Sequence, residues 1–82
     1  MKRFQVYKVQ EGVLYPLNSY DSVAWLRNYM YKHVSAGHEV YVYTESFGWP
    51  KWAGYSWVSG SGFAYLSRET EERLNKMPKV NA

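Results

Sequence analysis

The chain of 82 residues contains no cysteine, so it has neither a disulfide to staple a small fold nor a thiolate ligand for a metal. Histidine is scarce as well, since only His33 and His38 occur, on either side of Gly37. Because zinc sites need three or four such ligands, we expect no metal ion. Since no nucleotide-binding motif is present either, we expect no other cofactor. The stability of the fold must then come from the packing of side chains alone.

Long hydrophobic runs are also missing. No run approaches the roughly 20 apolar residues that cross a bilayer, and the opening MKRFQVYKVQ lacks the apolar segment of a signal peptide. We therefore expect no membrane partner and, with cysteine absent, a protein of the cytoplasm. Ten Lys and Arg residues against seven Asp and Glu residues give a net charge of +3, which permits nucleic acid as a partner without requiring it.

Catalytic and nucleotide-binding motifs are lacking too. The segment SGSG at 59–62 has neither the lysine nor the long helix of a phosphate-binding loop, and a hairpin turn fits it better. Ser35, His33 and Asp21 are residue types that occur in hydrolytic triads, but nothing in their spacing orients a nucleophile toward a base. We expect a protein that is not an enzyme.

What the chain has in abundance is aromatic residues: three Phe, nine Tyr and four Trp, or 20% of the sequence. Large rings bury roughly 150–250 Å² each and are an efficient way to build a small core. Their number nevertheless exceeds what a core of this size can enclose, so some rings should lie at the surface. They are densest in residues 47–67, FGWPKWAGYSWVSGSGFAYLS, where the only full charge is Lys51.

Hydrophobic periodicity predicts a single small α+β domain over residues 1–82, with an antiparallel sheet of four to five strands. The expected order is strand, strand, helix, strand, strand, strand, helix. The strands are expected at 3–9, 13–17 and 38–46 and as two short strands around 59–62, the main helix at 21–36, and a short C-terminal helix at 68–77.

The main helix carries an apolar stripe that should pack on one face of the sheet. The stripe consists of Val23, Leu26, Met30 and Val34, and its expected partners are Phe4, Val6, Val40 and Val42. Because one main helix covers only one face, the other face should display the alternate side chains, among them Tyr7, Tyr41 and Tyr43.

The candidate binding residues come from this second face and from the ring-rich segment. Glycine and proline interrupt residues 47–57 so often that we expect an irregular loop there. We predict that Trp57 folds back into the domain while at least one of Trp49 and Trp52 stays exposed in a recognition patch. In the alternative, both tryptophans cap the open end of the core, and the surface tyrosines are the better candidates. The predicted partner-binding residues are Trp49, Lys51, Trp52, Tyr55, Tyr41 and Tyr43.

The segments RFQVYKV, YPLNSYDSVAWLRNYM and GHEVYVYTES, which span about residues 3–45, resemble the small strand–strand–helix–strand proteins that bacteriophages encode as accessory or early genes. The resemblance implies a non-enzymatic protein of the host cytoplasm that binds and modulates, or inhibits, a host protein or defence complex. The basic charge argues against mimicry of DNA. The alternative function is single-stranded nucleic-acid binding, with Tyr and Trp rings stacking on bases between Lys and Arg. An edge strand or the tyrosine face could also pair with a second copy.

Overall fold

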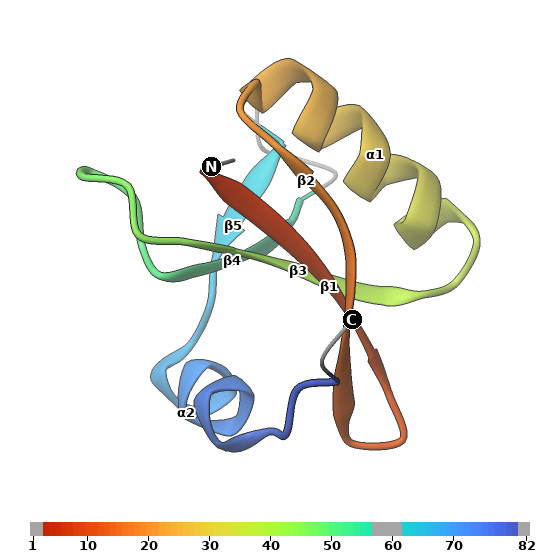
Figure 1. The fold of residues 1–82 in the computed structure, drawn as a ribbon, viewed down its shortest axis with the longest axis vertical. Coiled ribbons are helices and arrows are strands. Elements are labelled where there is room, and N and C mark those ends of the chain that lie inside the picture. The colour runs from red at the N-terminus through yellow and green to blue at the C-terminus, as the bar shows by residue number, and fades with distance from the viewer. Residues whose placement is uncertain (1–2, 57–61, 81–82) are drawn as a thin grey trace.

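The computed structural model describes residues 3–56 and 62–80, which form an antiparallel sheet with one helix on each side (Figure 1). The elements are β1 (Phe4–Gln10), β2 (Val13–Tyr20), α1 (Val23–Ser35), β3 (Glu39–Thr44), β4 (Trp52–Tyr55), β5 (Phe63–Tyr65) and α2 (Arg68–Lys76). The five strands lie in the order β2-β1-β3-β4-β5. This arrangement confirms the predicted α+β domain, with its main helix and its short C-terminal helix.

The β1–β2 hairpin places β2, the strand that contains a proline, at the edge of the sheet. Glu11 and Gly12 form its two-residue turn with φ values of 53° and 75°, the left-handed pair that suits the twist of a hairpin. Pro16 lies in β2 at the edge of the sheet, where its missing N–H interrupts no inner ladder. Beyond an irregularity in the register, β2 continues to Tyr20, three residues further than expected, by pairing with the start of β1.

The first core lies between α1 and the sheet, as the periodicity predicts. Leu26 and Met30 of α1 are fully buried, and Val23 and Val34 pack beside them. Their partners from the sheet include all four of the expected residues, Phe4, Val6, Val40 and Val42. The helix ends before Gly37, whose φ of 89° is the left-handed conformation that terminates helices.

The second core corrects the prediction of an open tyrosine face. Leu74 of α2 packs with Leu14 of β2 and Trp52 of β4, and all three are buried. The Ser67 hydroxyl oxygen accepts a hydrogen bond from the Thr70 N–H and begins α2 beneath this face. The helix is otherwise so polar that its single buried leucine gives a weak signal in the sequence. Tyr7, Tyr41 and Tyr43 are therefore partly covered rather than displayed.

The ring-rich segment also forms more regular structure than its glycines and proline indicate. Residues 52–55 make up β4, which pairs with β3 on one side and β5 on the other. Gly54 is not a turn residue here: a Cβ atom at this position would lie 3.2 Å from the Leu66 side chain and 3.8 Å from the Tyr41 ring. The glycine lets these side chains approach the strand closely.

Candidate functional site

The two tryptophans of the predicted patch lie on opposite faces of the sheet. Trp52 is only 1% exposed and packs in the second core, with its ring 5.1 Å from the Tyr43 ring. Trp49 is partly buried and folds onto the first core, where its ring lies 5.0 Å from Phe4. The prediction that at least one of these tryptophans stays exposed is wrong, because Trp49 is partly buried and Trp52 is buried. Strand alternation in β4 turns the Trp52 side chain toward α2. Trp57 lies outside the described residues.

The remaining members of the patch are not gathered around one centre. Lys51 is exposed in the turn before β4, and its carbonyl oxygen accepts a hydrogen bond from the Thr44 N–H. Tyr55 is partly buried on the α1 side of the sheet, with its ring 6.0 Å from that of Tyr31. Of the predicted set, Trp49 and Tyr55 share a face of the sheet, whereas Trp52 does not.

Tyr41 and Tyr43, the second choice of binding residues, are engaged within the fold. The Tyr41 hydroxyl donates a hydrogen bond to Glu39, and the Tyr43 hydroxyl donates one to Glu45, each over 2.6 Å. Burial, together with the Glu39 carboxylate, raises the pKa of Tyr41 to about 12. The hydrogen bond to Glu45 is the largest cause that raises the pKa of Tyr43. Both phenols therefore stay protonated at neutral pH.

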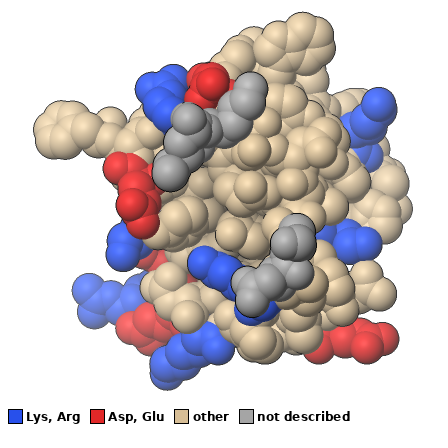
Figure 2. All heavy atoms as spheres, viewed as in Figure 1, with Lys and Arg blue, Asp and Glu red and all other residues tan. Residues whose placement is uncertain are grey.

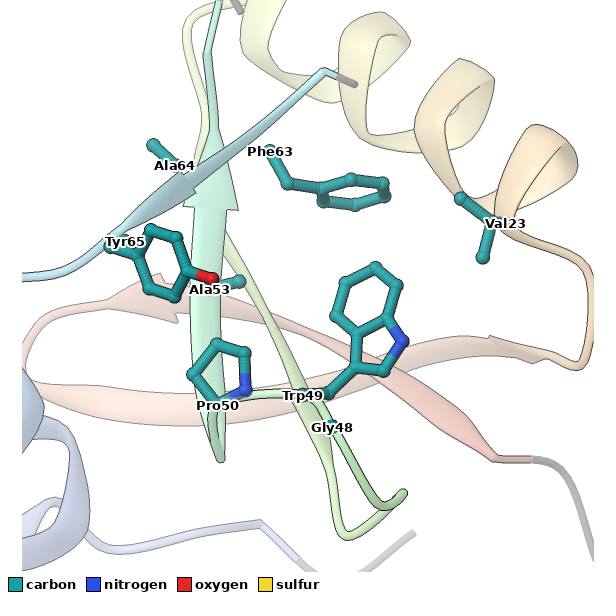
Figure 3. A pocket seen from close by; sticks show the side chains of 8 residues that line it. All are labelled: Val23, Gly48, Trp49, Pro50, Ala53, Phe63, Ala64 and Tyr65. Atoms are coloured by element: carbon teal, nitrogen blue, oxygen red, sulfur yellow. The ribbon is translucent and has the colours of Figure 1, made fainter.

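An apolar groove opens where the start of α1, the β3–β4 loop and the edge strand β5 meet (Figure 3). Its volume is about 300 Å³. In Figure 3 the rings of Trp49 and Phe63 point toward each other and toward Val23, with Pro50 and Tyr65 on the other side. The two facing rings meet edge to face, with centroids 5.3 Å apart. The groove is lined by Val23, Gly48, Trp49, Pro50, Ala53, Phe63, Ala64 and Tyr65.

Two exposed rings accompany this groove, and neither was among the predicted site residues. Tyr65, on the groove wall, is 86% exposed, and Phe47, which precedes Gly48 in the β3–β4 loop, is fully exposed. Phe47 falls in the ring-rich segment, but the tryptophans beside it give the stronger compositional signal for a binding site. Tyr65 alternates with Ala64 in a strand too short for its outward direction to be read from the sequence alone.

The charged side chains lie around an uncharged area of the surface. Figure 2 shows an uncharged area across the centre of the face viewed in Figure 1, with Lys, Arg, Asp and Glu side chains around its margin. Among the described residues on this face, the basic and acidic side chains are interleaved and do not form a basic stripe. Such a distribution favours a neutral, apolar contact over one that follows a phosphate backbone.

The histidines lie close together at the end of α1, but their setting is that of a packed pair. The two rings are 5.6 Å apart, and the His33 ring lies 4.6 Å from Tyr29. Within residues 3–56 and 62–80, no group of three or more His, Asp or Glu side chains is placed to hold a metal ion. In the same ranges no helix is long and apolar enough to cross a membrane.

His33 gives a testable pH dependence. Burial and the nearby charges of His38, Lys8 and Lys32 lower the pKa of His33 below its ordinary value of 6.5. The unfolded chain thus takes up this proton at a higher pH than the folded chain, so the free energy of unfolding has its full value above pH 6.5 and falls as the pH drops toward the folded pKa. We expect the free energy of unfolding of His33→Gln, measured by urea denaturation, to fall less steeply than that of the wild type between about pH 7.5 and pH 5. Equal slopes for the two proteins would contradict this account.

No protein-family model, curated protein or solved structure matches this chain. The groove and the rings around it are the features of the described residues that indicate a function.

Proposed function

We propose that this chain is a non-enzymatic binding module whose groove receives an apolar side chain from a partner protein. The observation that carries the proposal is the combination of the apolar groove with the exposed ring of Tyr65 on its wall and of Phe47 in the adjoining loop. Exposed aromatic rings beside a pocket are typical of the anchor points that dominate protein interfaces. Water solvates such rings poorly, so covering them favours association.

The size and chemistry of the groove favour a side chain over a small-molecule substrate. A volume of about 300 Å³ is at the lower end of the range for small-molecule sites, and each of the described lining residues is uncharged. Sites for substrates and cofactors carry a few converging polar groups that fix the orientation of the ligand. A leucine or phenylalanine side chain needs no such groups, because shape and burial suffice to hold it.

The resemblance to small bacteriophage proteins indicates what kind of partner the groove receives. We infer a protein of the host cell, whose activity the bound module modulates or inhibits. The nucleic-acid alternative depended on an open face of Tyr and Trp rings, and α2 covers that face at Trp52. A second copy of the chain remains an alternative occupant of the groove and is an outcome of the test below.

The test compares variants of the two exposed rings with a matched surface ring. Phe47→Ser and Tyr65→Ser should each weaken capture of the partner from a bacterial lysate by about 30-fold, the effect of losing an anchor worth about 2 kcal/mol. Their thermal stability should match that of the wild type, because both rings are exposed. Tyr15→Ser is the control, since Tyr15 is exposed on β2 at the opposite edge of the sheet.

Two results would overturn the proposal. One is capture that survives the Phe47→Ser, Tyr65→Ser double variant. The other is capture that disappears after nuclease treatment or in high salt, as expected if phosphates made the contact. Sedimentation of the purified chain identifies self-association: a dimer that the double variant abolishes would replace the host protein by a second copy as the occupant.

A further inference from the structure

Three aromatic rings on the α2 side of the sheet surround the ammonium group of Lys79. The Lys79 Nζ atom lies 4.9 Å from the ring centroid of Tyr43, 5.4 Å from that of Tyr7 and 5.8 Å from that of Trp52. All three distances are within the roughly 6 Å at which a ring attracts a cation through its quadrupole. We call Tyr7, Tyr43 and Trp52 the aromatic cage.

The cage is built from the side chains of three strands. Tyr7 comes from β1, Tyr43 from β3 and Trp52 from β4. The Trp52 ring packs against both of the others, with its centroid 5.6 Å from that of Tyr7 and 5.1 Å from that of Tyr43. Its indole N–H donates a 2.9 Å hydrogen bond to Asn75 Oδ1 of α2, which fixes the plane of the ring. A site held in this way loses little conformational entropy when a ligand binds.

The charges around the cage favour a cation. The Tyr43 hydroxyl donates a 2.6 Å hydrogen bond to the Glu45 carboxylate, which shifts electron density into the phenol ring and adds a negative charge nearby. Within residues 3–56 and 62–80, the Lys79 ammonium forms no ion pair. The contacts that the structure gives this ammonium group are those with the three rings.

Lys79, whose ammonium group fills the cage, is held to the sheet by one short backbone contact. Lys79 is exposed, and it lies on a single parallel bridge to Leu14 of β2. Two backbone hydrogen bonds of 2.9 Å make the bridge: the Leu14 N–H donates to the Pro78 carbonyl oxygen, and the Val80 N–H donates to the Leu14 carbonyl oxygen. A contact of only two backbone hydrogen bonds opens at low cost in free energy compared with the unfolding of a core element.

We propose that the aromatic cage is a binding site for the side-chain ammonium of a lysine, free or methylated, in a partner polypeptide, and that Lys79 is an internal occupant that competes with it. Rings arranged around an ammonium group are the arrangement by which proteins recognise such cations. The cage and the groove lie on opposite faces of the sheet, so this site is independent of the proposed groove function.

The experiment uses the full chain with Lys79→Ala and two probes of similar shape, tetramethylammonium chloride and the neutral tert-butanol, at matched ionic strength. Binding is followed by NMR through the indole N–H of Trp52, which is identified by its absence in Trp52→Phe. Tetramethylammonium should bind at least about fivefold more tightly than tert-butanol, the ratio that a cation–ring contribution of about 1 kcal/mol produces. Equal affinities, or no binding of either probe, would overturn the proposal.

Competition by Lys79 is tested with the wild type. Tethering gives Lys79 a high effective concentration at the cage, so the wild type should bind tetramethylammonium at least about tenfold more weakly than Lys79→Ala does. Displacement should also speed hydrogen exchange at the Val80 N–H, which the bridge protects. That exchange reports on the wild type even if Lys79→Ala disturbs the fold. Equal affinity of the two proteins, or exchange at Val80 that the cation leaves unchanged, would show that Lys79 is not a competing occupant.

Two variants separate the ring from its charge. Glu45→Gln removes the negative charge near Tyr43 and should weaken cation binding without changing that of tert-butanol. Tyr43→Phe keeps the ring but loses its hydrogen bond to Glu45. With all variants made in a Lys79→Ala background, its affinity for the cation should lie between that of the unaltered cage and that of Glu45→Gln. A trimethyllysine peptide should bind more tightly than the same peptide with norleucine; a preference for norleucine would rule out a polypeptide cation as the ligand.

Discussion

Replacing Trp52 by alanine should lower the free energy of unfolding by about 3–5 kcal/mol, the usual cost of removing a buried tryptophan side chain. Trp52 is 1% exposed and is the largest of the fully buried side chains among residues 3–56 and 62–80. It joins β4 to α2 through the packing of Leu74 and through the hydrogen bond from its indole N–H to Asn75. Chemical denaturation monitored by circular dichroism measures the loss.

Two companion variants test the cause of this loss. Asn75→Ala leaves the indole N–H without its partner and should cost about 1–3 kcal/mol, less than the loss of the whole ring. Trp25→Ala removes a tryptophan that is 68% exposed on α1 and should change stability by less than about 0.5 kcal/mol. A Trp52→Ala protein as stable as Trp25→Ala would mean that the second core does not contribute to the fold.

Leu26→Ala should lower the free energy of unfolding by about 2–5 kcal/mol. Leu26 is fully buried between α1 and the sheet, where it belongs to the same cluster as Phe4 and Val42. The cost combines the lost transfer of its side chain from water with the cavity that the surrounding residues cannot fill. Thermal denaturation measures this loss of stability. An unchanged melting temperature would contradict the packing of α1 on the sheet through Leu26. Ala24→Ser, on the exposed side of the same helix, is the control.

The parts of the fold that the sequence predicts well are those with strong periodicity. The α1 stripe and the alternation of Val40 and Val42 with tyrosines give the first core nearly residue by residue. Gly37 and Ser67 mark a helix end and a helix start because each satisfies a backbone requirement that few other residues meet. These signals are local, and the structure follows them.

The second core and the candidate groove escape prediction because they depend on contacts between distant residues. Leu74 is the only buried residue in a polar helix, and nothing local shows that it meets Leu14, sixty positions earlier in the chain. The direction of Trp52 depends on where β4 begins, and a shift of one residue would turn it to the other face. Phe63 and Trp49 form the groove only because β5 and the β3–β4 loop reach the start of α1 together.

The separation of Trp49 and Trp52 by only three positions links the two cores mechanically. One ring is anchored against Phe4 beneath α1, and the other is anchored against Leu74 above α2. An opening that frees either ring must move the short segment between them and so disturb the packing of the other. The two sides of the sheet should therefore unfold as one cooperative unit, and α2, whose own sequence is almost entirely polar, shares in the stability of the helix on the far side of the sheet.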